Sequence, residues 1–326
     1  MAYRGFVLRV LKACLLTLLF LFSIHLSLSY GSTGYRPFYT LDINSPIIEL
    51  RLSRTILAIL TGVSLAVAGS LIQVATRNSL ASPWILGLQS GALTAALLTM
   101  LINGIPTRVE IIFSAFIGSL TAYGLAISIA SLAGMTALSL VLGGIAVSSM
   151  LAGVSHLLIY LVQTKLRGQP VLILFGSLSL PSSKEIPLYI ATTLCGVAIA
   201  IVMWKQINAI VLGDDFAIQL GYDPRLIRLV LSAIAALLTA ASVSFVGIVS
   251  FVGLIAPHIA RLIVGDDARK HLPFCAISGA LIVLLADVFI RMISAHSTLG
   301  ELPLSIPTSI VGACVLSYLI VARGRG

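Results

Sequence analysis

One carboxylate in this 326-residue chain lies deep in an apolar stretch, and an arginine follows it at helical spacing. Asp287 and Arg291 are four residues apart, so on a helix they share one face and can form an ion pair. A structural pair near the end of its helix is the favoured interpretation. The alternative is an ion-coupled secondary transporter in which Asp287 binds a proton or a sodium ion.

A polar segment at about residues 213–224 has the pattern of a short amphipathic helix. Its two aspartates suit a first helical turn, and the glycine at its end suits the position just after a helix. Phe216 and Leu220 share one face, with Ala217 and Ile218 beside them. The segment either lies on the membrane surface or docks a cytoplasmic partner. Its candidate docking residues are Gly213, Asp214, Asp215, Phe216, Ala217, Leu220 and Gly221.

Two arginines, Arg51 and Arg54, precede an apolar run. Taken alone, they would be interfacial anchors. The tetrapeptide 51–54 has a faint echo in residues 225–228, Arg-Leu-Ile-Arg, which opens a later apolar run. Inverted repeats are common in transporters, although a match of four residues also arises by chance.

Three common motifs of enzymes are missing from the sequence. It contains no Gly-x-x-x-x-Gly-Lys-Ser/Thr phosphate loop, no His-Glu-x-x-His zinc motif and no Gly-x-Ser-x-Gly nucleophile elbow. The five histidines are scattered. We therefore expect no enzymatic activity, no metal site and no cofactor. The net charge of +9 is typical of basic loops that orient a membrane protein, and we expect no binding to nucleic acid.

The elements that carry these residues are apolar helices. The composition is 59% hydrophobic and 10% charged, and apolar runs long enough to cross a bilayer follow one another along the whole chain. We predict an all-α integral membrane protein with one transmembrane domain, residues 1–326, and about ten spans. The predicted spans are 13–28, 55–75, 84–102, 109–131, 136–163, 187–204, 229–249, 251–264, 272–293 and 303–321. The span 251–264 is short and contains Pro257, so we expect an irregular element buried among other helices.

An even number of spans places both termini on the same side, which we predict to be the cytoplasm, with an uncleaved first helix. The inner side then holds 12 of the 20 basic residues and the outer side 8. This bias agrees weakly with the positive-inside rule. The positive-inside rule therefore does not explain the arginines of the outer side, which include Arg51, Arg54 and Arg291.

Several segments in a fixed order are similar to one family, and together they extend from about residue 50 to the C-terminus. They are 51–55, 78–87, 213–221, 251–262, 285–287 and 301–303. On these segments the chain resembles the membrane permease subunit of the ABC importers for cobalamin, iron–siderophores and haem. Departures are Ser53 for a frequent Pro, Ser79 and Ser82 for a common Pro and Asp, and Ser305 and Cys314 for a common Gly and Pro. They leave the class unchanged, and the carried chelate stays open.

The resemblance implies a type II importer permease fold built from inverted repeats in the inner, cytoplasmic membrane. It implies a homodimer that forms the pathway for a metal chelate, two separate ATP-binding cassette ATPase subunits and an extracytoplasmic binding protein. The arginines that match Arg51, Arg54 and Arg291 receive glutamates of the binding protein in that family. Residues 213–221 match the coupling helices that contact the ATPase.

Overall fold

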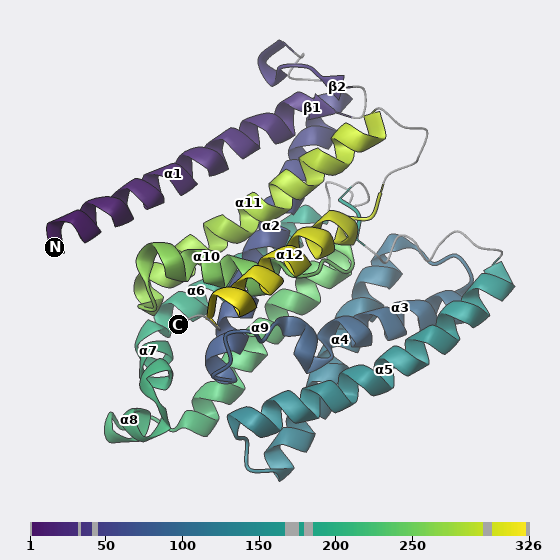
Figure 1. Cartoon of the computed structure of the whole chain (residues 1–326). Coiled ribbons are helices and arrows are strands. Elements are labelled where there is room, and N and C mark those ends of the chain that lie inside the picture. Colours follow the sequence, from purple (N-terminus) through teal and green to yellow (C-terminus); the bar gives the residue numbers. More distant parts are fainter. Residues whose placement is uncertain are drawn as a thin grey trace.

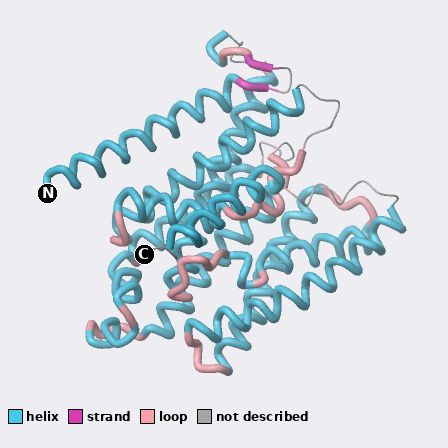
Figure 2. Tube along the Cα trace, in the orientation of Figure 1, coloured by secondary structure: helices cyan, strands magenta, loops and turns pink. Residues whose placement is uncertain are grey.

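The computed structural model describes residues 2–31, 34–40, 45–166, 176–178, 185–295 and 302–323. The fold is a bundle of helices with one short hairpin at one end (Figures 1 and 2). The helices are α1 (Ala2–Ser29), α2 (Pro46–Ala75), α3 (Leu88–Asn103), α4 (Arg108–Leu132), α5 (Ala137–Leu166), α6 (Ile186–Val202), α7 (Trp204–Leu212), α8 (Asp214–Gln219), α9 (Pro224–Val246), α10 (Val252–Val264), α11 (Ala268–Ala295) and α12 (Ser305–Arg323). The remaining elements are β1 (Tyr30–Gly31), β2 (Gly34–Tyr35), η1 (Phe38–Thr40) and η2 (Pro83–Leu86).

The lengths of these helices confirm the predicted membrane architecture. Within the described residues, six helices are long and apolar enough to cross a bilayer, and α6 with α7 forms a seventh span bent by 58°. Three further apolar helices, α3, α10 and α12, are shorter. Each predicted span corresponds to one of these elements. The chain is therefore a multi-pass membrane protein with close to ten spans.

Local sequence signals explain where several of the spans begin. The side chain of Ser45 accepts a hydrogen bond from the backbone of Ile48, and Pro46 follows as the first residue of α2. Thr107 and Glu110 form a reciprocal capping box at the start of α4. The side chain of Asp223 accepts a hydrogen bond from the backbone of Arg225, and Pro224 is the first residue of α9. These caps satisfy backbone N–H groups that have no partner within their own helix.

Two central helices organise the bundle. α2 and α9 pack against each other, and most residues of both are buried. Helices α3, α4 and α5 pack together beside α9, whereas α10 and α11 pack on α2. Each central helix leads through a largely non-helical segment into a short helix and then a long one. α2 begins at the end that carries the hairpin and α9 begins at the end that carries α8, so the two halves run in opposite directions (Figure 1). This is the predicted inverted-repeat arrangement.

Three local features differ from the sequence-based expectations. α10 is a regular, mostly buried helix that contains Pro257, and the irregular backbone precedes it at residues 247–251. The predicted span 187–204 continues through the bend into α7. A two-stranded antiparallel hairpin, β1 with β2, follows α1 in an otherwise helical chain. Its register pairs Gly31 with Gly34, and a Cβ at Gly31 would overlap the guanidinium of Arg51.

The helices of the core approach closely because glycines face each other. Gly62 of α2 lies against Gly279 of α11, and Gly69 of α2 lies against Gly253 of α10. A Cβ placed on any of these four residues would overlap the backbone of the facing helix. Small residues at such crossings let membrane helices pack backbone to backbone.

Candidate functional site

The hairpin end of the bundle holds a buried charge cluster around Asp287. The Asp287 carboxylate is fully buried, and one of its oxygens lies 2.6 Å from Nη2 of Arg291. The i,i+4 pair predicted from spacing is therefore present in the structure. The other oxygen lies 2.7 Å from Nη2 of Arg54, which comes from α2, 233 residues away in sequence. Spacing gave no signal for this second pair.

Arg51 and Arg291 also bind the end of α1. Nη1 of Arg51 donates to the carbonyl oxygens of Leu28 at 2.9 Å and Ser29 at 3.1 Å. Nη1 of Arg291 donates to the carbonyl oxygen of Ser27 at 2.8 Å. α1 has no basic residue in its own last turn. The two arginines from α2 and α11 therefore satisfy carbonyl groups at its C-terminus and place positive charge at the negative end of its dipole.

The structure brings Arg51, Arg54 and Arg291 together as one cluster. Arg51 and Arg291 are 7% and 4% exposed, so both are buried in this chain. The side chain of Arg54 is 15% exposed. The cluster contains three arginines and one aspartate, of which Arg54 and Arg291 bind the aspartate, so an excess of positive charge is left at the hairpin end. The docking role implied by the resemblance stays a prediction, and the contacts seen in the chain are structural ones.

The opposite end carries the predicted amphipathic helix as α8. Asp214 and Asp215 form its first turn, and Gly221 follows it with φ 81°, as the capping pattern predicted. Ala217 is fully buried against the bundle. The large apolar side chains are exposed instead, Phe216 by 42% and Leu220 by 54%. α8 therefore presents apolar surface outward from the tip of the bundle.

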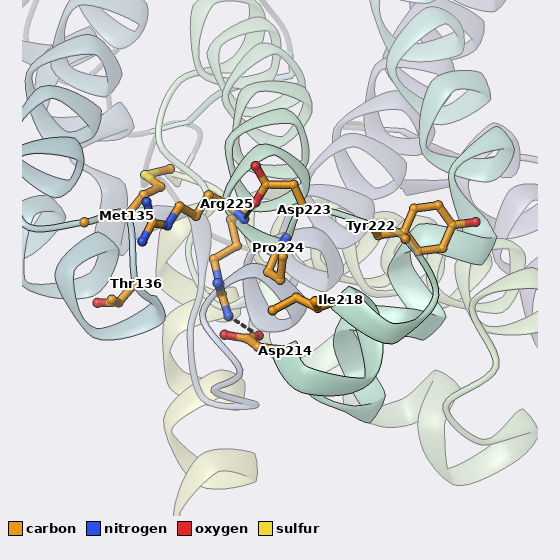
Figure 3. Close-up of a pocket in the computed structure, with 11 residues that line it drawn as sticks. Met135, Thr136, Asp214, Ile218, Tyr222, Asp223, Pro224 and Arg225 are labelled. Atoms are coloured by element: carbon orange, nitrogen blue, oxygen red, sulfur yellow. Dashed lines mark hydrogen bonds and ion pairs between the residues drawn. The ribbon is translucent and has the colours of Figure 1, made fainter.

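A cavity of about 600 Å³ lies beside α8, between the α4–α5 turn and the start of α9 (Figure 3). Its lining includes Met135, Thr136 and Asp223. Asp214 closes one side of it through an ion pair with Arg228, at 2.5 Å between Oδ1 and Nη2. Sequence analysis named Asp214 as a docking residue and Arg228 only as part of a repeat. It missed their contact because a non-helical turn separates the two residues.

The neighbouring helix α7 is fixed to the α10–α11 turn by Asn208. Its Nδ2 donates to Oδ1 of Asp267 at 2.9 Å, and its Oδ1 accepts from the backbone N–H of Ala268 at 2.8 Å. The bond from Asn208 Nδ2, followed by one from the backbone N–H of Arg269, favours the ionised carboxylate and lowers the pKa of Asp267. α7 is thus tied to α11, and α8 follows it after Gly213.

Two of the similar segments, 78–87 and 251–262, meet in the interior of the bundle. They share a cavity of about 270 Å³ lined by residues of both, Trp84 and Phe251 among them. Phe251 has φ 65°, an unusual backbone conformation for an aromatic residue. Gln89 is 4% exposed in this lining and donates to the carbonyl oxygen of Val249 at 3.3 Å. The sequence indicated both segments but not that they are in contact.

Comparison with known proteins agrees with this geometry. The chain is 32% identical to a Fe(3+)-citrate import system permease protein of Bacillus subtilis, over 97% of this chain and 96% of that protein. It is 33% identical to a cobalamin import system permease protein of Halobacterium salinarum, over 84% and 73% of the two chains. A solved structure of an inward-facing metal-chelate type ABC transporter superposes with a TM-score of 0.83 at 25% identity, covering 94% of this chain and 97% of that one.

The family profile gives the same result over the length of the bundle. The profile of the FecCD transport family matches residues 17–322, from within α1 to within α12. The charge cluster and α8 both lie inside this range. The chain therefore belongs to the FecCD transport family, a family of membrane transport permeases.

Proposed function

We propose that the chain is the transmembrane subunit of an ABC importer and forms, as a homodimer, the translocation pathway for a metal chelate. The substrate class is an iron–siderophore, haem or cobalamin. The observation that carries this proposal is the similarity to an import permease for ferric citrate over 97% of the chain and to one for cobalamin over 84% of it. Separate ATPase subunits supply energy, because the sequence has no phosphate loop.

The ion-coupled alternative has less support. Its coupling carboxylate, Asp287, lies between two guanidinium groups at 2.7 and 2.6 Å. Each carboxylate oxygen already has an arginine partner within the chain, so the buried carboxylate offers no free oxygen to a transported ion.

The proposed orientation places the α8 end in the cytoplasm and the hairpin end outside. The cytoplasmic end then carries a dense set of basic residues, as the positive-inside rule requires. These include Arg77, Lys205, Arg225, Arg228, Arg261, Arg269 and Lys270. In this orientation α1 begins in the cytoplasm and α12 ends there.

The experiment that tests the function is uptake by a reconstituted complex. The chain is purified with the ATPase and binding protein encoded beside it and placed in vesicles. Uptake of ferric citrate, a ferric siderophore, haem and cobalamin is measured with and without ATP inside. We expect no ATP hydrolysis by the chain alone and ATP-dependent uptake of one chelate class by the complex. Uptake driven by an ion gradient without the ATPase would contradict the proposal.

The apolar surface of α8 is the proposed ATPase contact. Phe216→Asp or Leu220→Asp should leave the chain folded in the membrane, because both side chains are exposed in it. Each should weaken ATPase binding, since the new carboxylate would be buried unpaired in the contact at a cost of several kcal/mol. The measurement is co-purification of the ATPase with the chain.

The matched control for these variants is Gln219→Asp. It adds the same charge to the same helix but replaces an exposed polar residue, so no apolar contact is lost. Normal ATPase binding and transport by both Phe216→Asp and Leu220→Asp would remove α8 from the proposed interface.

The charge cluster at the hairpin end is the proposed dock for an acidic binding protein. Charges at a docking surface steer association more than they add affinity. Arg54→Gln keeps a hydrogen-bond donor near Asp287 and removes one positive charge from the most exposed member of the cluster. It should slow association of the binding protein, and the rate should depend less on salt. The Debye length falls from about 10 Å at 0.1 M to about 3 Å at 1 M, which screens such steering.

Arg108→Gln is the control for charge loss at the same end. Arg108 pairs with Glu185 at 3.1 Å, and its side chain is 24% exposed, but it is not part of the cluster. Association kinetics are measured across a salt series with both variants. An unchanged rate for Arg54→Gln would remove Arg54 from the proposed dock.

A further inference from the structure

One guanidinium group connects α8 to the central helix α2. Arg228 lies in the second turn of α9 and is 3% exposed. Its Nη2 binds Oδ1 of Asp214, the first residue of α8, at 2.5 Å. Its Nε donates to the carbonyl oxygen of Ala75, the last residue of α2, at 3.1 Å. Figure 3 shows the pair with Asp214 as a dashed line.

The helix that this arginine holds is short and has a glycine at each end. α8 has six residues and lies between Gly213 with φ 128° and Gly221 with φ 81°. Both glycines adopt backbone conformations that other residues rarely reach, and hinges often contain such small residues. α8 packs on α7 and α9. The Arg228 side chain contacts both α8 and the end of α2, and α7 packs on both helices as well.

The opposite end of α2 is held in a related way. Arg54 in α2 binds Asp287 of α11, just as Arg228 in α9 binds Asp214 of α8. Arg54 is the last residue of the Arg-x-x-Arg tetrapeptide 51–54, and Arg228 is the last residue of the tetrapeptide 225–228 in the other inverted half. α2 has 30 residues and is about 45 Å long at about 1.5 Å per residue. A largely buried helix of this length connects the two ends of the bundle.

We propose that Arg228 is the positioning residue that links the ATPase-contacting helix α8 to α2, so that movement of α8 is transmitted along α2 to the hairpin end. The inference rests on the proposed function. It assigns to this arginine the transmission step between ATP hydrolysis and opening of the pathway. A purely structural arginine would instead cap α2 and affect only stability.

The test compares chelate transported per ATP hydrolysed in the reconstituted complex. Arg228→Lys keeps the positive charge, but an ammonium lacks the planar fork that binds Asp214 and the Ala75 carbonyl together. Asp214→Ala removes the contact from the α8 side, where the aspartate side chain is 38% exposed and its loss is compatible with folding. We expect the transport ratio to fall about tenfold in both variants, the size of a typical coupling energy. ATPase binding and hydrolysis should persist in Arg228→Lys, because Arg228 lies outside the docking residues of α8.

Arg225→Ala is the matched control, because Arg225 is exposed and lies one turn earlier on the same helix. Its ratio should equal that of the unaltered chain. An unchanged ratio in Arg228→Lys and Asp214→Ala, or an equal loss in Arg225→Ala, would overturn the inference and leave the proposed function intact. A lack of chelate uptake by the unaltered complex would overturn both.

Discussion

Asp287→Asn is expected to prevent the chain from accumulating as a folded, monodisperse membrane protein. The substitution leaves Arg54 and Arg291 facing each other without the carboxylate that now binds both at 2.7 and 2.6 Å. Removing one partner of a buried ion pair costs about 3–5 kcal/mol, because the remaining charge is uncompensated. Here the substitution would leave the charges of both arginines uncompensated. The loss is comparable with a large part of a typical folding free energy.

The measurement is the amount of protein in the membrane and its thermal unfolding after extraction into detergent. Asp266→Asn is the matched control. Asp266 also pairs with an arginine at 2.6 Å, but its side chain is 61% exposed, so water replaces the lost contact. Asp287→Asn combined with Arg54→Met should lose less stability than the sum of the two single changes, because the double variant removes one uncompensated charge.

The same variant separates the two functional classes. If Asp287→Asn folds normally and only the ion dependence of transport changes, Asp287 is a coupling carboxylate and the structural role assigned to it is wrong. If the protein is lost from the membrane, the carboxylate is needed to assemble α1, α2 and α11. The contacts of Arg291 with both Asp287 and Ser27 favour the second outcome.

Sequence reasoning located the site residues better than it described their contacts. The Asp287–Arg291 pair could be predicted because both residues lie on one helix at a fixed spacing. The Arg54–Asp287 and Arg228–Asp214 pairs could not, since each joins different helices whose packing is set by the whole bundle. The burial of Arg51 could not be predicted from the sequence either. Its position before an apolar run indicated an interfacial anchor, whereas the hairpin and α1 enclose it.

The fold was more predictable than the site, for a physical reason. Each span must satisfy its own backbone hydrogen bonds in hydrocarbon, so an apolar run of sufficient length is nearly bound to be a helix. The break after residue 75 was predicted correctly, but two boundaries were wrong. The predicted span 84–102 begins before α3 does, at residues that form η2, and the predicted span 229–249 extends past the end of α9 at Val246. Contacts between distant residues stabilise these breaks, such as that of Gln89 in α3 with the carbonyl of Val249. Backbone at membrane depth is irregular only where other segments of the protein cover it. A single sequence does not show which segments these are.

Gly62→Leu or Gly279→Leu is expected to abolish the packing of α2 against α11. A Cβ at Gly62 overlaps the carbonyl oxygen of Gly279, and a Cβ at Gly279 overlaps that of Gly62. The clash is with backbone on both sides, so no side-chain rotation relieves it. Overpacking a close-packed core costs about 1–3 kcal/mol where the neighbours can adjust, and more where they cannot. Separation of these helices would also break the Arg54–Asp287 pair that joins them.

Gly124→Ala is the control that gives this prediction its meaning. Gly124 lies within α4, and a Cβ there meets nothing within 4 Å in the chain. Because alanine favours helix by about 1 kcal/mol over glycine, this variant should be at least as stable as the unaltered chain. The comparison is made by membrane abundance and by thermal unfolding in detergent. If both leucine variants unfolded at the same temperature as Gly124→Ala, α2 and α11 would not pack backbone to backbone. The proposed transmission of α8 movement along α2 would then lose support, because it requires that neighbouring helices hold α2 in place.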